Sequence, residues 1–171
     1  MTERMTQYRW FWVWDFEKEE RWLNEMAERG WTLAEVGFCR FTFEATECSE
    51  YTVRLEMHPY DDDYLDFMEE TGAEYIGRVL QWMYFRKRSE LGSFDIFSDL
   101  DSRINHIRTV FRTVLGLGLA NLSIGIANLS IGNVNSIVAI FNLLVATLLM
   151  YGGGRLQGKM EYLENERRLR E

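Results

Sequence analysis

The sequence contains few of the residues on which small secreted domains and many enzymes depend. Its 171 residues include two cysteines, two histidines and a single proline. Two cysteines are too few for a disulfide scaffold, and Cys39 and Cys48 do not form a C-x-x-C pair. The net charge of -8 disfavours a nucleic-acid partner, whose phosphates require a basic face. With 47% hydrophobic residues, the composition also excludes a disordered chain.

Catalytic motifs are missing as well. The sequence has no G-x-S-x-G elbow, no Walker loop and no H-E-x-x-H motif. Neither His58 nor His106 has an evident nucleophile beside it, so general acid–base catalysis has no obvious carrier. Aspartates 61–63 favour the start of a helix rather than a metal cluster. The sequence therefore predicts a non-enzymatic protein without a cofactor or a bound metal.

Charge is absent from one long segment. Residues 113–154 contain no Asp, Glu, Lys, Arg or His, and the turn-forming sequence IGNVNS lies near their middle. A bilayer core needs roughly 20 helical residues to cross it, so the segment is long enough for two crossings. We expect a transmembrane helical hairpin with arms at about 113–131 and 134–151. The alternative, a buried hairpin of a soluble protein, would have to cover helices that are apolar on all sides.

Basic residues indicate the orientation of this hairpin. Arg103, Arg108 and Arg112 precede it, and Arg155 and Lys159 follow it. Lys and Arg remain on the cytoplasmic side of membranes, which predicts a multi-pass protein of the cell membrane with both termini cytoplasmic. Residues 92–112 are expected to form an amphipathic connector, and residues 155–171 a charged cytoplasmic tail.

The hairpin segment also has a period of seven residues. The phrase ANLSIG occurs twice in succession, and asparagines and small residues recur at this spacing. Small residues let helices approach closely in lipid, and asparagines can form hydrogen bonds between helices. We therefore predict a packing surface, called here the heptad seam: Gly118, Asn121, Gly125, Asn128, Ala139, Asn142 and Ala146. Its partner is either the other arm of the hairpin or a second subunit.

Residues 1–91 have the pattern of a small α+β domain. We expect a strand in the aromatic segment 7–16, a helix that ends at Gly30, and one bent strand over 31–46. A strand at 50–58 would pair antiparallel with that bent strand, because both alternate apolar and polar residues. A helix at 61–72 and a last strand or strand pair follow. This order, β-α-β-β-α-β, predicts a ferredoxin-like cytoplasmic domain.

Aromatic residues are the candidate ligand-binding or partner-binding surface of this domain. Trp10, Trp12 and Trp14 would share one face of the first strand, and Trp82 and Tyr84 one face of the last. One interpretation is core packing. The other is an exposed surface that binds a partner, a small apolar ligand or the membrane surface.

Several motifs resemble a known bacterial family. These are WFWVWDFEKEERWLNEMAERGW, GFCRFTFE, YTVRLE, EETGAEYIGR with WMYFRK, and FDIFSD. They are similar to the family called domain of unknown function 2812 (DUF2812), in which transmembrane helices usually follow the domain. Members are often encoded beside PadR-like transcription regulators, which implies a regulatory or stress-linked role. The resemblance brings no catalytic residues with it.

Together these features predict a membrane-anchored regulatory or protein-interaction module. It would associate with itself, or with a membrane or regulatory protein, through the heptad seam. The alternative function is a sensor that binds a small apolar ligand on the aromatic sheet face.

Overall fold

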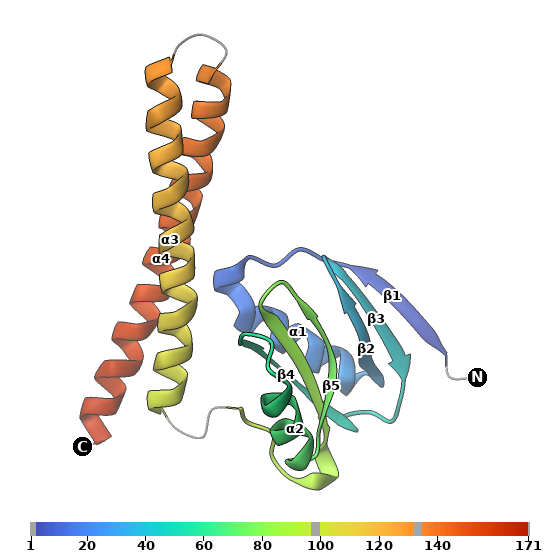
Figure 1. Ribbon diagram of the computed structural model, residues 1–171. Coiled ribbons are helices and arrows are strands. Elements are labelled where there is room, and N and C mark those ends of the chain that lie inside the picture. The colour runs from blue at the N-terminus through green and yellow to red at the C-terminus, as the bar shows by residue number, and fades with distance from the viewer. Residues whose placement is uncertain (1–2, 97–99, 132–134, 171) are drawn as a thin grey trace. The chain divides into compact units, whose positions relative to one another are not determined.

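A computed structural model describes residues 3–96, 100–131 and 135–170 (Figure 1). The chain divides into two compact units, residues 1–98 and 99–171. The first contains all of the strands found in the described residues, and we call it the α/β unit. The second consists of two long helices and is called the hairpin unit.

The α/β unit contains two antiparallel three-stranded sheets, with strand orders β1-β3-β2 and β4-β6-β5. A short 3-10 turn, η1 (Val13–Asp15), precedes the first helix, and a second, η2 (Ser89–Leu91), follows the last strand. The principal elements are β1 (Arg4–Tyr8), α1 (Phe16–Glu28), β2 (Trp31–Gly37), β3 (Arg40–Ala45), β4 (Tyr51–Met57), α2 (Asp62–Glu70), β5 (Ala73–Val79) and β6 (Trp82–Arg88).

These elements form an internal repeat. Each half runs strand, helix, strand, strand, and each sheet has its third strand in the middle. The two hairpins share one register: Trp31 pairs with Ala45, and Ala73, 42 residues later, pairs with Lys87. Each hairpin also has a register shift at the equivalent place, between residues 33 and 35 and between residues 75 and 77. The equivalent positions keep four identical core or turn residues: Leu23/Leu65, Met26/Met68, Gly30/Gly72 and Phe43/Phe85.

Each helix of the repeat ends at a glycine and packs on a sheet. Gly30 and Gly72 have φ angles of 82° and 84°, the left-handed conformation that terminates helices and favours glycine. The Trp22 ring of α1 meets Phe43 edge-on, with ring centroids 5.6 Å apart. In the second half Met68 of α2 belongs to a buried cluster with Phe85. The identical residues of the repeat therefore build the two halves of the core.

Helix α1 also reaches the second sheet. The side chain of Asn24 accepts a hydrogen bond from the Val53 N–H and donates one to the Val53 carbonyl, both at 2.9 Å. One turn earlier, Glu20 accepts a hydrogen bond from the Leu55 N–H at 3.3 Å. These side chains satisfy backbone groups of β4, which pairs with β6 on its other side. An open strand edge is in this way closed by a helix.

The structure corrects several predictions for the α/β unit. The expected strand at 7–16 is wrong, because β1 ends at Tyr8 and the chain then turns into η1. The expected bent strand over 31–46 is a hairpin of β2 and β3, with Cys39 in its turn at a φ angle of 55°. The predicted pairing of this segment with β4 is also wrong, since β4 pairs with β6.

The broad fold class is nevertheless confirmed, because the chain is α+β followed by a helical hairpin. The ferredoxin-like topology is not confirmed, because six strands form two sheets. Both predicted helices are present as α1 and α2, and the strand at 50–58 is present as β4, with alternating burial. For the segment after α2 the sequence predicted either a last strand or a strand pair, and the structure has the strand pair β5 and β6.

The hairpin unit consists of α3 (Leu100–Ile131) and α4 (Asn135–Arg170). Their lengths of 32 and 36 residues correspond to about 48 and 54 Å at 1.5 Å per residue. The helices are antiparallel, since Asp101 near the start of α3 bonds Arg167 near the end of α4 at 2.6 Å. Arg108 likewise pairs with Glu164 at 3.2 Å.

Helix α3 begins at Leu100, so residue 113 marks the end of the charged sequence and not the start of a helix. The charged tail is the continuation of α4 and packs through Leu156 and Leu163, both buried. The hairpin unit therefore has a charged section, residues 100–112 beside 155–170, which we call the stalk. Its charge-free section covers the described residues between 113 and 154.

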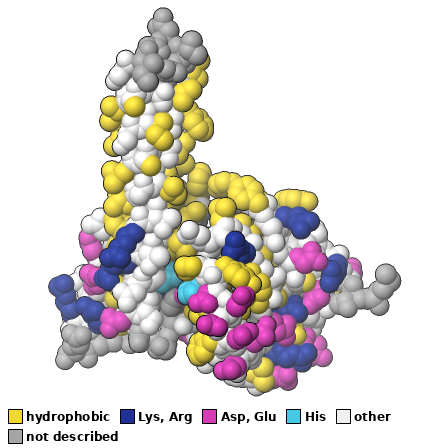
Figure 2. Space-filling model, in the orientation of Figure 1, with side chains coloured by type: hydrophobic (Ala, Val, Ile, Leu, Met, Phe, Trp, Pro, Cys, Tyr) yellow, Lys and Arg dark blue, Asp and Glu magenta, His cyan; other side chains and the backbone are white. Residues whose placement is uncertain are grey.

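Both helices are long and apolar enough to cross a membrane. Only 22% of the most apolar stretch of each helix is buried, whereas the core helix of a soluble protein is mostly buried. Figure 2 shows hydrophobic side chains along the charge-free part of the hairpin.

The contact between Asn24 and Val53 leads to a prediction about stability. Asn24→Ala should lower the free energy of unfolding by about 1–3 kcal/mol, because Val53 is fully buried and both backbone groups lose a partner. Urea unfolding of the full chain in mild detergent, followed by tryptophan fluorescence, measures this change.

The matched control is Asp66→Ala, because Asp66 occupies the equivalent position of α2 and is exposed. Equal unfolding midpoints for the two variants would contradict the role assigned to Asn24.

Candidate functional site

The small residues of the heptad seam lie between the two arms of the hairpin. A Cβ atom added to Gly118 would lie 3.1 Å from Met150 Cε, and one added to Gly125 would lie 2.9 Å from Leu143 Cδ2. Ala139 and Ala146 are 0% and 3% exposed. The sequence left two partners open for these four residues, the other arm of the hairpin or a second subunit. In the structure they pack against the other arm.

The asparagines of the seam lie at its margin. Asn121, Asn128 and Asn142 are half-buried, and each donates its side-chain amide to the carbonyl four residues earlier, at 2.9, 2.9 and 2.8 Å. A carboxamide has two N–H donors and an oxygen that accepts two hydrogen bonds. One internal bond therefore leaves each asparagine with polar capacity for a group outside its own helix.

Large apolar side chains surround these asparagines. Those at least 50% exposed include Leu117, Leu119, Ile124, Ile126, Leu129, Ile137, Ile140, Phe141 and Leu144. An exposed surface of this size and apolarity marks a membrane or protein contact rather than a surface that faces water. Asn121 and Asn128 lie seven residues apart on one face of α3, and we call these two, together with Asn142 of α4, the asparagine row.

The structure separates the predicted aromatic surface into two groups. Trp14, Trp82 and Tyr84 are buried, whereas Trp10 and Trp12 are 55% and 40% exposed. Trp12 stacks on Trp14, with ring centroids 5.0 Å apart. The five residues therefore do not form one open face, and only two of them are accessible.

Two further exposed aromatics lie near this pair and were missed in the sequence. Phe38 is 69% exposed, and its ring meets Trp10 edge-on at 5.9 Å. Tyr8, which is 76% exposed, ends β1 two residues before Trp10. The sequence did contain an indication that Phe38 is exposed, because it follows Gly37, a residue typical of hairpin turns. The prediction of one bent strand over 31–46 placed no turn at this position.

Half-buried glutamates form a second group that the sequence did not reveal. Glu19 of α1 accepts a hydrogen bond from the Tyr84 hydroxyl at 2.6 Å, and Glu56 of β4 accepts one from Tyr64 at 2.5 Å. Burial raises the pKa of both carboxyls, and the tyrosine hydrogen bonds oppose this rise. Burial also raises the pKa of Glu20, against the pull of Arg54. These groups can hold protons above the usual pH range of a glutamate.

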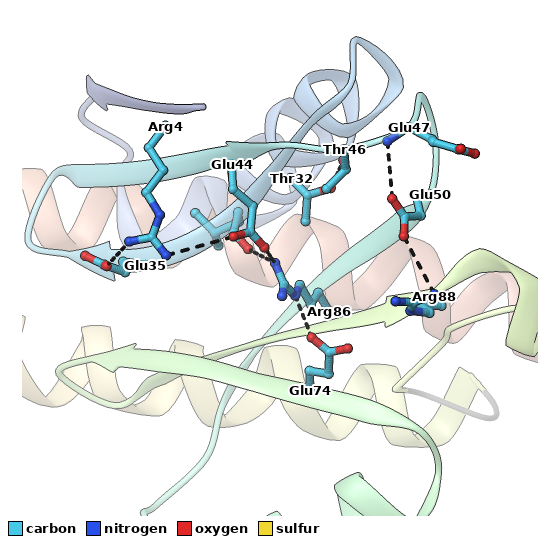
Figure 3. Close-up of polar contacts among 11 residues, drawn as sticks. Arg4, Thr32, Glu35, Glu44, Thr46, Glu47, Glu50, Glu74, Arg86 and Arg88 are labelled. Atoms are coloured by element: carbon cyan, nitrogen blue, oxygen red, sulfur yellow. Dashed lines mark hydrogen bonds and ion pairs between the residues drawn. The ribbon is translucent and has the colours of Figure 1, made fainter. Parts of the chain in front are cut away.

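A charged cluster joins the two sheets (Figure 3). Arg86 of β6 bonds Glu44 of β3 at 2.6 Å, Glu74 of β5 at 2.8 Å and the Leu33 carbonyl at 3.1 Å. Its guanidinium also lies 4.6 Å from the centre of the Tyr51 ring. The contacts of Arg86 are with other side chains and backbone of the unit, which makes this cluster a structural connection between the halves.

Comparison with known proteins gives one match. A family model described as a protein of unknown function, DUF2812, matches residues 15–119. The chain belongs to this family. No curated protein and no solved structure matches the chain.

The family match extends from the start of α1 into the charge-free part of α3. The DUF2812 region therefore includes most of both halves of the internal repeat together with residues 100–119 of α3. Because the family has no described function, it assigns no role to any residue of the two candidate surfaces.

The position of Gly125 leads to a prediction about the hairpin. Gly125→Leu should destabilise the packing of α3 on α4 by about 1–3 kcal/mol, because the new side chain would overlap Leu143 and approach the Ala139 carbonyl. The measurement is the midpoint of loss of helical circular dichroism during titration with SDS.

Gly116→Leu is the matched control, since a Cβ at Gly116 meets nothing within 4 Å. Both changes raise intrinsic helix propensity, so a drop in both midpoints would contradict the close contact at Gly125.

The half-buried glutamates, of which Glu19 is the example, lead to a prediction about the pH dependence of stability. A carboxyl whose folded-state pKa is raised keeps its proton while the unfolded chain has lost it, so stability should fall as pH rises from 4.5 through the raised pKa. In Glu19→Gln this fall should be smaller, because the amide does not titrate. Urea midpoints over a pH series starting at 4.5 measure the slope.

Glu25→Gln provides the control on the same helix, because Glu25 is exposed. An identical slope in wild type and Glu19→Gln would refute a raised pKa at Glu19.

Proposed function

We propose that the protein is a membrane-anchored, non-enzymatic interaction module that self-associates through the asparagine row of its hairpin. The observation that carries this proposal is the row of half-buried asparagines on an apolar surface. The α3–α4 hairpin would cross the cell membrane twice. Both termini would be cytoplasmic, because basic side chains gather in the stalk and are absent from 113–154.

The asparagine row favours a second copy of the hairpin as its partner. The small residues of the seam are already used between the two arms of one hairpin. An amide with spare donors and acceptors has no water to bond in lipid, and hydrogen bonds between such groups are worth roughly 0.6–2 kcal/mol. Asn121 and Asn128 lie seven residues apart on one helix face, so two hairpins could meet along this line.

The α/β unit would then be the part that communicates with other proteins on the cytoplasmic side. The family resemblance suggests a regulatory protein of the PadR-like class as a partner. The alternative function, a sensor for a small apolar ligand on the sheet face, has less support, because Trp14, Trp82 and Tyr84 are buried.

Self-association through the asparagine row can be tested by removing it. The double variant Asn121→Leu, Asn128→Leu should shift the full chain toward the monomer, because the new surface offers only apolar contacts that lipid also provides. Sedimentation equilibrium in mild detergent measures the distribution of species.

The matched control is Ser123→Leu, Ser130→Leu. These serines occupy the same two copies of the repeated phrase and also bond the carbonyl four residues earlier, but they are exposed. Unchanged association in the asparagine variant, or an equal loss in the serine variant, would overturn the proposal.

A further inference from the structure

The exposed rings of Tyr8, Trp10, Trp12 and Phe38 form what we call the aromatic patch. Their exposed fractions are 76%, 55%, 40% and 69%. We propose that the aromatic patch inserts into the headgroup region of the bilayer that holds the hairpin. The inference rests on the proposed membrane anchoring and adds a second contact with the same membrane.

The patch is a defined structure rather than a set of scattered side chains. It combines the segment after β1 with the turn between β2 and β3, which are far apart in the sequence. Trp10 stands edge-on to both Trp12 and Phe38, at 5.4 and 5.9 Å. Trp12 also stacks on the buried Trp14, which fixes the position of the Trp12 ring. Rings held in place by one another lose little conformational freedom on binding.

The chemistry of the patch fits a lipid headgroup region. Tryptophan and tyrosine gather at membrane interfaces because their rings are apolar and each carries one polar group. Two exposed arginines, Arg9 and Arg40, lie beside the patch in sequence, although the whole chain carries a net charge of -8. Basic side chains at such a position are attracted to anionic lipids, at about 1 kcal/mol each.

The internal repeat shows that the fold does not require this patch. The position equivalent to Phe38 is Leu80, in the turn between β5 and β6. The segment between β4 and α2 is shorter than the one between β1 and α1, and it contains one aromatic residue, Tyr60. Over the described residues, the second half therefore folds in the same topology without an equivalent exposed aromatic patch.

The test uses the native tryptophans, because all six lie in the α/β unit and none in the hairpin. The full chain is reconstituted into vesicles of phosphatidylcholine and phosphatidylglycerol in which a fraction of the lipid carries bromine on the acyl chains near the headgroup. Bromine quenches fluorescence only at short range. We expect quenching in the wild type, and loss of most of it in Trp10→Phe, Trp12→Phe.

Matched variants identify the residues responsible. Phe38→Asp should reduce the quenching, whereas Leu80→Asp, at the equivalent exposed turn, should leave it unchanged. Trp31→Phe removes a tryptophan outside the patch and should also leave it unchanged. Quenching that is absent in the wild type, or that persists in Trp10→Phe, Trp12→Phe, would overturn the inference.

Insertion of the hairpin is measured separately. Ile126→Trp, at a position 55% exposed on α3, is added to the variant that lacks Trp10 and Trp12. Quenching of this tryptophan by lipid brominated deep in the acyl chain shows that the hairpin is in the membrane. Its absence would refute the proposed anchoring, and the inference about the patch with it. A quenched Ile126→Trp beside an unquenched patch would refute the patch alone.

Discussion

A backbone N–H or carbonyl group that has left water needs another partner, and this requirement shapes both units. In the α/β unit it is met at the edge of β4, where Asn24 bonds both backbone groups of Val53 and so acts in place of a neighbouring strand. The contact also ties α1, which belongs to the first half of the repeat, to the sheet of the second half. Without it the two halves would share fewer contacts, and both backbone groups of Val53 would lose their partner from α1.

The hairpin unit meets the same requirement differently. Its helices satisfy their backbone groups internally, as any segment that crosses a lipid bilayer must. Some of its polar side chains also bond within their own helix. Ser123, Asn128 and Thr147 each donate a hydrogen bond to a carbonyl one turn earlier. Serine and threonine use their one donor in this bond, whereas asparagine keeps a second N–H donor for another group. This difference is why the asparagines, and not the hydroxyls, point to a partner outside the hairpin.

Features with a local cause could be predicted from the sequence. Gly30 ends α1, the aspartates begin α2, and buried and half-buried residues alternate along β4 as the sequence indicates. These features could be predicted because helix caps and side-chain periodicity depend on only a few neighbouring residues. The charge-free segment likewise predicted two helices. The strand pairing could not be predicted in the same way. The paired residues of β4 and β6 are separated by 25 residues or more in the sequence, and the alternation along β4 does not indicate which strand it pairs with.

The aromatic segment shows a different limit of prediction. Alternating large residues indicate a strand, but Trp10 and Trp12 lie in the segment between β1 and η1, where their rings pack on one another instead of on a sheet. The candidate site was therefore half predicted: the two exposed tryptophans were named, and Phe38 was not. In the hairpin, the spacing of seven correctly grouped the small residues on a helix face. It could not distinguish the residues that face the other arm from those at the margin, because that depends on how two helices cross.

The internal repeat explains which residues differ between the halves. Some positions that face inward within one half are identical, as for Phe43 and Phe85, because each half must fill a similar space. An ion pair between equivalent positions of the two halves, in contrast, cannot use identical residues. Glu44 and Arg86 are equivalent in the repeat and bond one another at 2.6 Å, so two glutamates or two arginines there would repel. The repeat is therefore asymmetric at this contact, and it is also asymmetric at the surfaces that the contact leaves open. Phe38 and Leu80 differ at such a surface, which is why function is to be sought where the halves no longer match.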